Sequence, residues 1–413
     1  MLKPVFRMEG GTAVYQQYID PDHVADLDFF LHLIRSKPVG GISESHPQLD
    51  WDYIVKLARR HKVLPLLYAS LRKRGLVEQL PAAVQDDLRA KYLRIAADNM
   101  RFEQRLIEIV VLLAEQGVPA VPFKGPVLAR CLYGDPALRQ YSDMDILVPA
   151  DKVARAFEII QPVGYRPKRL HLTKDQLKRF VNFTKSFDFL DDRGQVELDL
   201  HWRLSMHTGR VYNFEFCRER LTTVSFERGT LPCLSPEDMV VFLCVHGTSH
   251  NWANADTVLS VAEYIGQYPN LDWALIVKLA DKLDCRRMVW LGLFLARDLF
   301  GVNLPVDITG QMEKEGVVDN LARQVYASLF EFHDADSHFQ KRLREVPFQL
   351  MARDSWPARL YYIQWRLFWP TQKDWEALPL PAGLWFLYFV LRPVMLGLEV
   401  LGLRGNGIRV LRF

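Results

Sequence analysis

Four carboxylates lie in two pairs with the same spacing in short apolar segments of the chain. Asp143 and Asp145 begin one apolar run, and Glu197 and Asp199 lie in a second run further along the sequence. Successive side chains of a β-strand point to opposite faces of the sheet, so residues two apart share a face. We therefore expect both members of each pair on one face, opposite an apolar face that packs in a core.

Carboxylates held side by side repel one another, and burying them unpaired is costly. A hard divalent cation such as Mg²⁺, or Mn²⁺ in its place, resolves this repulsion because it takes oxygen ligands. Asp143 and Asp145 are therefore predicted to bind metal together with a third carboxylate from a neighbouring strand, either Asp199 or Glu197. Such a clamp, with one or two metal ions, suits phosphoryl or nucleotidyl transfer. The metal would neutralise the phosphate, and a carboxylate would help to deprotonate the attacking hydroxyl.

Basic and small residues near these acids could hold the phosphates of a nucleotide. Lys124-Gly125 ends an apolar segment and opens a helix, which is a natural site for an anion. Lys124 either reaches a nucleotide phosphate or lies on the surface beside a structural glycine. Arg139, four residues before Asp143, either pairs with a triphosphate or neutralises the acidic pair. Ser142 directly precedes that pair and completes the predicted nucleotide-binding set on this side.

Three histidines need a separate interpretation. His201 follows the second acidic pair and is predicted to orient a carboxylate or to pack beside the site, so we include it in the nucleotide-binding set. His246 and His250 share one face of a predicted helix and could bind a metal. No glutamate occupies the zinc-protease position between them, so packing in the core or in a nucleotide cleft is the favoured interpretation.

These motifs together resemble the nucleotidyltransferase core of DNA polymerase β and its relatives. They resemble more closely a large bacterial group of uncharacterised nucleotidyltransferases. The resemblance extends from about Trp51 to Leu304, and more weakly to the C-terminus. The residues that carry it are Phe123-Lys124-Gly125, Arg139, Asp143-Met144-Asp145 and Asp199-Leu200-His201-Trp202. The turn of the wider superfamily is Gly-Gly or Gly-Ser, so the Lys-Gly turn here puts the phosphate contacts of that turn in question.

The resemblance implies a Mg²⁺-dependent enzyme that moves a nucleoside monophosphate from an NTP to a hydroxyl or another nucleophile. Asp143, Asp145 and Asp199 would be its catalytic residues. The acceptor stays open among a small molecule, a sugar, a peptide, a protein and an RNA. Two other functions remain as alternatives. One is the transfer of a different group from a nucleotide-activated donor, and the other is a catalytically silent nucleotide-binding or scaffold protein.

The amino-acid composition restricts the cellular compartment and the classes of partner to be expected. The chain of 413 residues is 49% hydrophobic and 24% charged, with a net charge of +3, so bulk charge does not favour a nucleic-acid partner. Its five cysteines show no Cys-x-x-Cys spacing, which argues against a zinc site or a disulfide framework. The N-terminus lacks the apolar core of a signal peptide. We therefore expect a cytoplasmic protein.

The order of helical and strand patterns predicts an α+β fold, in which a small mixed β-sheet core lies between large helical regions. Expected strands cover 118–123, 143–148, 187–190 and 196–201, with a hairpin joining the last two. Four regions follow from the pattern. They are an N-terminal helical region 1–117, a nucleotidyltransferase core 118–234, a helical substrate or nucleotide-cleft region 235–330 and an aromatic-rich helical region 331–413.

The two ends of the chain carry weaker expectations. Residues 1–19 are predicted to form a poorly structured N-terminal segment. Pro381 to Leu403 is apolar enough to suggest a membrane span, but the central Arg392-Pro393 makes membrane contact unfavourable. We expect two helices broken at that dipeptide, packing on the core or on another subunit, which leaves a homo-oligomer open.

Overall fold

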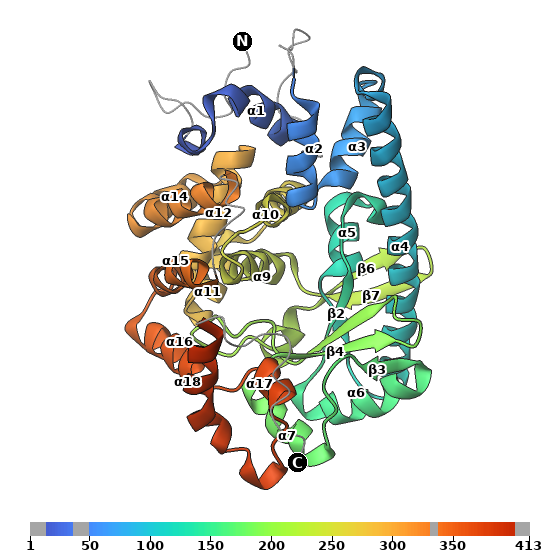
Figure 1. The fold of residues 1–413 in the computed structure, drawn as a ribbon, viewed down its shortest axis with the longest axis vertical. Coiled ribbons are helices and arrows are strands. Elements are labelled where there is room, and N and C mark those ends of the chain that lie inside the picture. Colours follow the sequence, from blue (N-terminus) through green and yellow to red (C-terminus); the bar gives the residue numbers. More distant parts are fainter. Residues whose placement is uncertain (1–13, 36–48, 331–337, 401–413) are drawn as a thin grey trace.

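The computed structural model describes residues 14–35, 49–330 and 338–400. A small five-stranded sheet lies beside the long helix α4 (Ala82–Glu115), which runs along one edge of the molecule, and most of the other helices lie on the far side of the sheet (Figure 1). The N-terminal helices lie at one end of the molecule and the C-terminal helices at the other. This arrangement confirms the predicted α+β fold, a small mixed sheet with large helical regions on either side.

The sheet is mixed because one strand pair is parallel. Its strand order is β1-β2-β5-β4-β3, with β2 and β5 parallel and the other neighbouring pairs antiparallel. The first predicted strand is shorter than expected and lies at the sheet edge, where its proline needs no ladder partner. The strands are β1 Val121–Pro122, β2 Asp143–Leu147, β3 Tyr165–Pro167, β4 Ser186–Asp191 and β5 Glu197–His201.

Several short elements were not predicted. They are β3, the helix α7 (Lys174–Phe183) and a separate hairpin of β6 (Thr222–Phe226) and β7 (Gly229–Cys233). β3 has three residues, too few to show a period, and most of β6 is exposed and lacks an apolar face. Short or solvent-facing strands carry little hydrophobic periodicity, which was the signal used to find the others.

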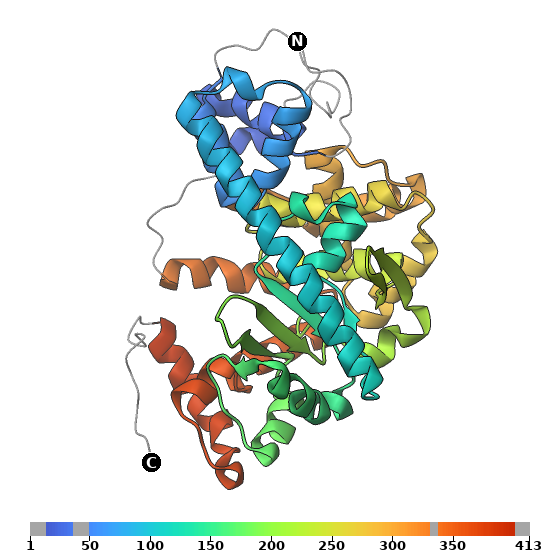
Figure 2. The ribbon, with the colours of Figure 1, turned by 90° about the vertical axis from the view of Figure 1, so that its right-hand side faces the viewer.

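One face of the sheet is apolar and packs against α4 and α6 (Val153–Ile160). Figure 2 shows α4 running diagonally past the strands. The side chains that alternate with the acids lie in one buried cluster with residues of both helices; they are Met144, Ile146, Leu198 and Leu200. Because side chains alternate along a strand, the carboxylates project from the other face, as predicted.

The helix α9 (Pro236–Ser249) faces the acidic side of the sheet. It is buried along most of its length and packs against α10 (Ala255–Gln267), α11 (Trp273–Leu283) and α12 (Arg286–Phe300). The remaining helices up to residue 330 are α1 Val24–Leu33, α2 Trp51–Arg60, α3 Leu64–Lys73, α5 Gly125–Tyr133, α8 Phe214–Cys217, α13 Val306–Glu313 and α14 Val317–Phe330. The acidic residues therefore lie between a sheet and a largely apolar helical layer.

The unstructured lead-in expected for residues 1–19 is wrong for its last part. Val14–Tyr18 forms a short 3₁₀ helix. The Tyr15 ring lies 6.3 Å from the Tyr326 ring and 6.0 Å from the Phe330 ring, centroid to centroid. These contacts join segments far apart in the sequence, so no local pattern could reveal them. The first part of that segment lies outside the described residues.

The break expected at Arg392-Pro393 is also wrong. The helix α18 (Leu387–Val400) runs through both residues. The Arg392 side chain is buried, and its Nη1 lies 3.2 Å from Oδ1 of Asp374 in α17 (Gln372–Ala377). This tertiary ion pair anchors the helix at the point where proline weakens it locally. Within the described part of the chain, no helix combines the length and apolarity that a membrane span requires.

Candidate active site

The predicted carboxylates meet where β2 and β5 lie side by side. Parallel pairing places Asp145 directly opposite Asp199, and Asp143 directly opposite Glu197. Asp145 is only 1% exposed, while the other three are partly exposed. The structure therefore brings all four predicted metal-binding residues together on one face of two adjacent strands.

A fifth carboxylate, Asp188, joins this group from β4, where the antiparallel register places it opposite Asp199. Burial, together with the negative charges of Asp188, Asp145 and Asp143, raises the pKa of Asp199 to about 8. The sequence analysis did not identify Asp188. The available signal was an acid between two phenylalanines in the strand that the predicted hairpin pairs with the acidic strand.

Asp145, Asp199 and His201 form a group whose ligand atoms lie within 4.8 Å of one another. Each has a buried atom without a hydrogen-bond partner in the described structure, namely Asp145 Oδ2, Asp199 Oδ1 and His201 Nε2. Buried polar atoms are nearly always hydrogen-bonded, and a cation bound by these neighbouring residues would satisfy such atoms. Two carboxylates and an imidazole fit a divalent cation, with the oxygens suiting Mg²⁺ and the nitrogen adding affinity for Mn²⁺.

The orientation of His201 supports the same interpretation. Its Nδ1 lies 3.4 Å from the carbonyl oxygen of Arg203 and its Nε2 lies 3.0 Å from Asp145 Oδ1, so both ring nitrogens face acceptor oxygens. Burial lowers the pKa of His201 despite the nearby Asp145, which keeps the ring neutral. A neutral ring has a single N–H, so only one of these two contacts can be a hydrogen bond, and a cation at Nε2 would leave Nδ1–H to bond the carbonyl. Metal-binding histidines are commonly anchored through a carbonyl in this way.

A second group of possible ligands shares one residue with the first. Asp188, Glu197 and Asp199 also have ligand atoms within 4.8 Å of one another. Glu197 already forms an ion pair with Lys168, which follows β3. Asp199 therefore belongs to both groups, whereas Glu197 has a counter-ion of its own.

Lys124 lies inside the site rather than on the open surface. Its Nζ donates a hydrogen bond of 2.8 Å to Asp145 Oδ1. Burial lowers the pKa of Lys124, but Asp145 and Asp143 more than reverse this, so the ammonium stays charged. Burial likewise raises the pKa of Asp145, but Lys124 and His201 bring it below its ordinary range. An ionised Lys124–Asp145 pair therefore occupies the centre of the site.

The glycine of the turn has a structural role. Gly125 has φ of +52°, and a Cβ at this position would lie 2.7 Å from the carbonyl oxygen of Asp143. Only glycine allows the turn to approach β2 this closely. The approach holds Lys124 beside Asp145 at the N-terminus of α5. Ser142 is exposed immediately before β2.

Arg139 has a partner that the sequence analysis did not foresee. Its Nη2 lies 3.3 Å from Oδ2 of Asp256 in α10, and both side chains are largely buried. Arg139 also lowers the pKa of Asp143, although burial and Asp145 raise it more. Arg139 therefore lies close to the acidic pair but is ion-paired to the helical layer.

Replacing Arg139 by glutamine should lower the free energy of unfolding by about 3 kcal/mol, because Asp256 would be left buried without its counter-ion. The double variant Arg139→Gln/Asp256→Asn should recover much of this loss. Urea denaturation of the three proteins tests the prediction. A single variant as stable as the wild type would show that Arg139 has no structural role.

A row of aromatic rings runs from His201 beside the acids to the end of α9. The centroids of His201 and Phe123 are 5.1 Å apart, as are those of Phe123 and Phe242, and His246 stacks on Phe242 at 5.5 Å. His250 follows at 4.6 Å from His246. Burial lowers the pKa of His250 to about 4, and these two histidines belong to no metal-binding group of the described residues. His246 is partly buried against Phe242 and His250 is exposed at the end of α9, which agrees with the favoured interpretation of packing for His246 alone.

Comparison with known proteins places the chain in a family. A family model described as an uncharacterised nucleotidyltransferase matches residues 47–301, which include the turn and all the acids described above. The chain belongs to this family. No curated protein matches it. A crystal structure of an antigenic nucleotidyltransferase-like protein from Paracoccidioides brasiliensis aligns with 13% sequence identity and a TM-score of 0.27, covering 51% of this chain and 94% of that one.

This nucleotidyltransferase family member has a further base in the site, Lys185, which the sequence analysis missed. Its carbonyl oxygen accepts a hydrogen bond of 2.9 Å from the backbone N–H of Trp202, just before β4. Burial lowers the pKa of Lys185, and Lys124 lowers it further, whereas Asp145 and Asp199 act against the shift. The backbone of Lys185 therefore lies beside the residues that follow β5. A single lysine before a strand carries no sequence signature that could have revealed this.

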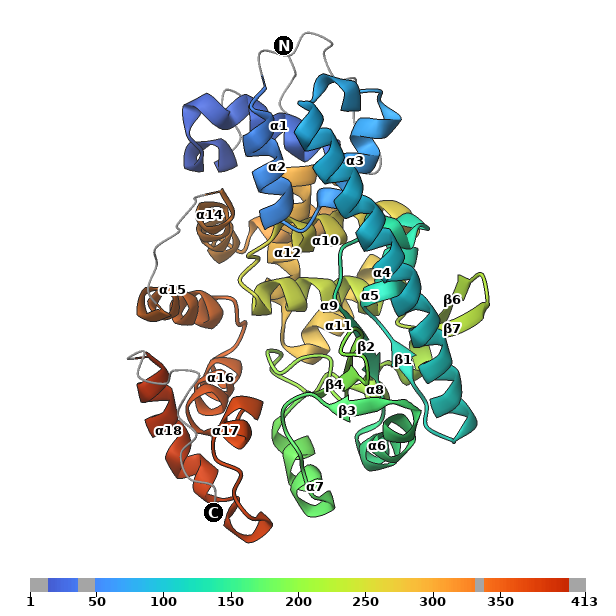
Figure 3. The same ribbon diagram turned by 45° about the vertical axis from the view of Figure 1, so that its right-hand side comes forward.

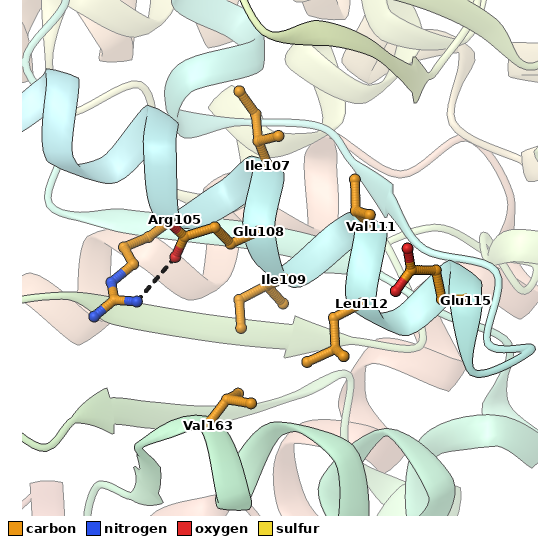
Figure 4. Close-up of a pocket in the computed structure, with 8 residues that line it drawn as sticks. All are labelled: Arg105, Ile107, Glu108, Ile109, Val111, Leu112, Glu115 and Val163. Atoms are coloured by element: carbon orange, nitrogen blue, oxygen red, sulfur yellow. Dashed lines mark hydrogen bonds and ion pairs between the residues drawn. The ribbon is translucent and has the colours of Figure 1, made fainter.

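A groove of about 470 Å³ elsewhere on this family member is a different feature. It lies along α4 near the turn at Val163 (Figure 4). Its lining is mainly aliphatic, and two of its three charged residues, Arg105 and Glu108, form an ion pair at 2.9 Å, the third being Glu115. None of the acids and bases described above lines it, so it is separate from the active site.

Proposed function

We propose that this protein is a Mg²⁺- or Mn²⁺-dependent nucleotidyltransferase that moves a nucleoside monophosphate from an NTP to a hydroxyl or other nucleophile of an acceptor. One observation carries the proposal: Asp145, Asp199 and His201 place ligand atoms within 4.8 Å of one another beside Lys124. Membership of a nucleotidyltransferase family supports this class of reaction.

The residues suggest a division of roles. Asp143, Asp145 and Asp199 would hold the divalent cation, which would supply charge stabilisation at the α-phosphate. Lys124, released from Asp145, and the backbone N–H groups at the start of α5 would bind the phosphates, with Arg139 nearby. The acceptor oxygen would form a bond to the α-phosphorus. The bond from that phosphorus to the bridging oxygen would break, and pyrophosphate would leave with the electron pair.

The proton of the nucleophile needs an acceptor, and Asp199 is our choice over Glu197. Asp199 belongs to both groups of possible ligands and has a buried oxygen without a hydrogen bond. Glu197 is already neutralised by Lys168. A carboxylate without a counter-ion is the better base and the better metal ligand.

Incubation with each of the four NTPs, Mg²⁺ or Mn²⁺ and an extract of the native host tests the reaction. We expect pyrophosphate release and a nucleotide-sized mass gain on one acceptor, both lost in the Asp143→Asn/Asp145→Asn variant and after metal removal by a chelator. Nucleotide binding without pyrophosphate release would instead indicate a silent nucleotide-binding protein. Transfer of a different mass would indicate another group from a nucleotide-activated donor.

A further inference from the structure

The exposed apolar side chains of the described chain gather on two helices near its C-terminal end. Ten large apolar side chains between residues 356 and 398 are exposed, against six in the rest of the described chain. They lie in α16 (Trp356–Phe368) and in or just before α18, and they are Trp356, Leu360, Ile363, Leu367, Phe368, Leu384, Phe386, Val390, Val394 and Leu398. Single exposed apolar residues are ordinary, whereas an exposed cluster of this size marks a binding surface.

The spacing of these residues places them on one outer face of each helix. Those of α16 recur at intervals of three or four residues, and those of α18 at intervals of four. Residues three and four apart share a face of a helix. Among the exposed residues of α16 only Gln364 is polar, and those of α18 up to Leu398 are all apolar. The two outer faces therefore expose no charged side chain.

The inner faces of the same helices are packed, so the outer faces belong to helices that are fixed on the core. Ala358 and Tyr362 of α16 and Tyr388 of α18 are buried. Just before α18, the Trp385 ring stacks on Phe183 of α7 with the centroids 5.5 Å apart. The helices α16 and α18 also pack against each other, at the lower left of the molecule in Figures 1 and 3.

Arg392 does not interrupt the apolar face of α18. Its side chain is 3% exposed and forms the ion pair with Asp374 described above. The sequence analysis counted this arginine against membrane contact, because a charge is costly in an apolar environment. In the folded protein that charge is neutralised inside the molecule. The argument against membrane contact therefore does not apply to the outer face of α18.

The charged residues beside the two outer faces are mainly basic. Between residues 355 and 398, the charged side chains that reach the solvent are Arg359, Arg366, Lys373 and Glu376. The Arg359 guanidinium lies 5.2 Å from the centroid of the exposed Trp356 ring. The sequence that follows α18, residues 401–413, adds three arginines and no acid. Apolar helical faces bordered by tryptophan and basic residues are typical of helices that lie on membranes with anionic lipids.

We propose that the outer faces of α16 and α18 bind the surface of a membrane that contains anionic lipids. The apolar side chains would enter the boundary between headgroups and acyl chains, and neither helix would cross the bilayer. Arg359 and Arg366 would contact the lipid phosphates. A second copy of the chain fits these faces less well, because a two-fold contact would bring the positive charges of both copies to one interface.

Flotation of the full-length protein with vesicles tests the proposal, using phosphatidylcholine alone or mixed with phosphatidylserine. We expect binding to the mixed vesicles that weakens as the salt concentration rises. The Leu360→Glu/Val390→Glu variant places a charge on each apolar face and should bind at least about tenfold more weakly. Arg366→Gln should weaken binding to the mixed vesicles about fivefold, as expected for one basic residue at an anionic surface.

Val306→Glu is the matched control. Val306 is 86% exposed but lies in α13, outside the two outer faces, so this change should leave vesicle binding as in the wild type. All the substituted side chains are exposed or partly exposed, so the thermal unfolding of each variant should match that of the wild type.

Two results would overturn the proposal. One is equal vesicle binding by the wild type and Leu360→Glu/Val390→Glu. The other is a wild type that binds neither kind of vesicle. In that case, a dimer in light scattering that the double variant converts to a monomer would show that a second copy covers these faces. The flotation assay contains no NTP, so its outcome does not depend on the proposed nucleotidyl transfer.

Discussion

Replacing Asp145 by asparagine should reduce metal-dependent pyrophosphate release by about 1,000-fold, because a metal ligand contributes several kcal/mol of charge stabilisation. The same change should lower the free energy of unfolding by about 3 kcal/mol, because it leaves a buried ammonium without its partner. That ammonium is Lys124, whose Nζ lies 2.8 Å from the Asp145 carboxylate. Urea denaturation of the metal-free protein and a pyrophosphate assay measure the two effects separately.

A double-variant cycle identifies the cause of the stability loss. Adding Lys124→Met to Asp145→Asn should restore most of the lost stability but none of the activity, since the buried charge is then removed. If the Asp145→Asn single variant were as stable as the wild type, the ion pair would contribute little. If that variant still released pyrophosphate at the normal rate, the proposed metal site would be wrong.

Replacing Asp199 by asparagine should cost as much activity but should raise stability. The pKa of Asp199 is raised in the fold to about 8 by burial and by Asp188, Asp145 and Asp143. A folded pKa above the unfolded value means that the protonated carboxyl favours folding, and this stability is lost as the pH rises from about 4 towards 8. At pH 8 the Asp199→Asn variant of the metal-free protein should therefore be more stable than the wild type by about 2 kcal/mol, after allowance for partial exposure.

Denaturation at pH 5 and pH 8 checks the sign of this effect. The difference between wild type and Asp199→Asn should be small at pH 5 and favour the variant at pH 8. Addition of Mn²⁺ should reverse the order at pH 8, because only the wild type has the full ligand set. Asp192→Asn, in the exposed turn of the same hairpin, serves as the matched control and should show no such dependence. A variant less stable than the wild type at pH 8 would contradict the prediction.

The spacing of the acids was enough to place the core of the site. Residues two apart on a strand share a face whatever the rest of the fold does, so Asp143 with Asp145, and Glu197 with Asp199, could be paired from the sequence. The hairpin signal at Asp191-Asp192-Arg193-Gly194 also placed the second acidic strand beside another strand. What local pattern could not supply was the strand order, and with it the position of Asp188 opposite Asp199.

The partners of the basic residues could not be predicted from the sequence, for a different reason. Arg139 pairs with Asp256, which is 117 positions away, and the two meet only because α10 packs beside the sheet. Ion pairs between distant segments depend on tertiary packing, which hydrophobic periodicity does not encode. The same limit explains α18, where a buried pair with Asp374 keeps a helix intact across a proline.

Because β2 and β5 pair in parallel register, a change in chain length should disrupt the site when it falls within β5. The same change should be tolerated in the turn before β5. Asp145 faces Asp199 because five residues of each strand pair in register. A one-residue deletion within β5 would put a leucine opposite Asp145 and turn the acids into the core. The exposed turn at 192–195 lies outside this ladder, so a natural or engineered insertion there would leave the acids aligned. Variation in chain length should therefore accumulate in that turn and avoid β5.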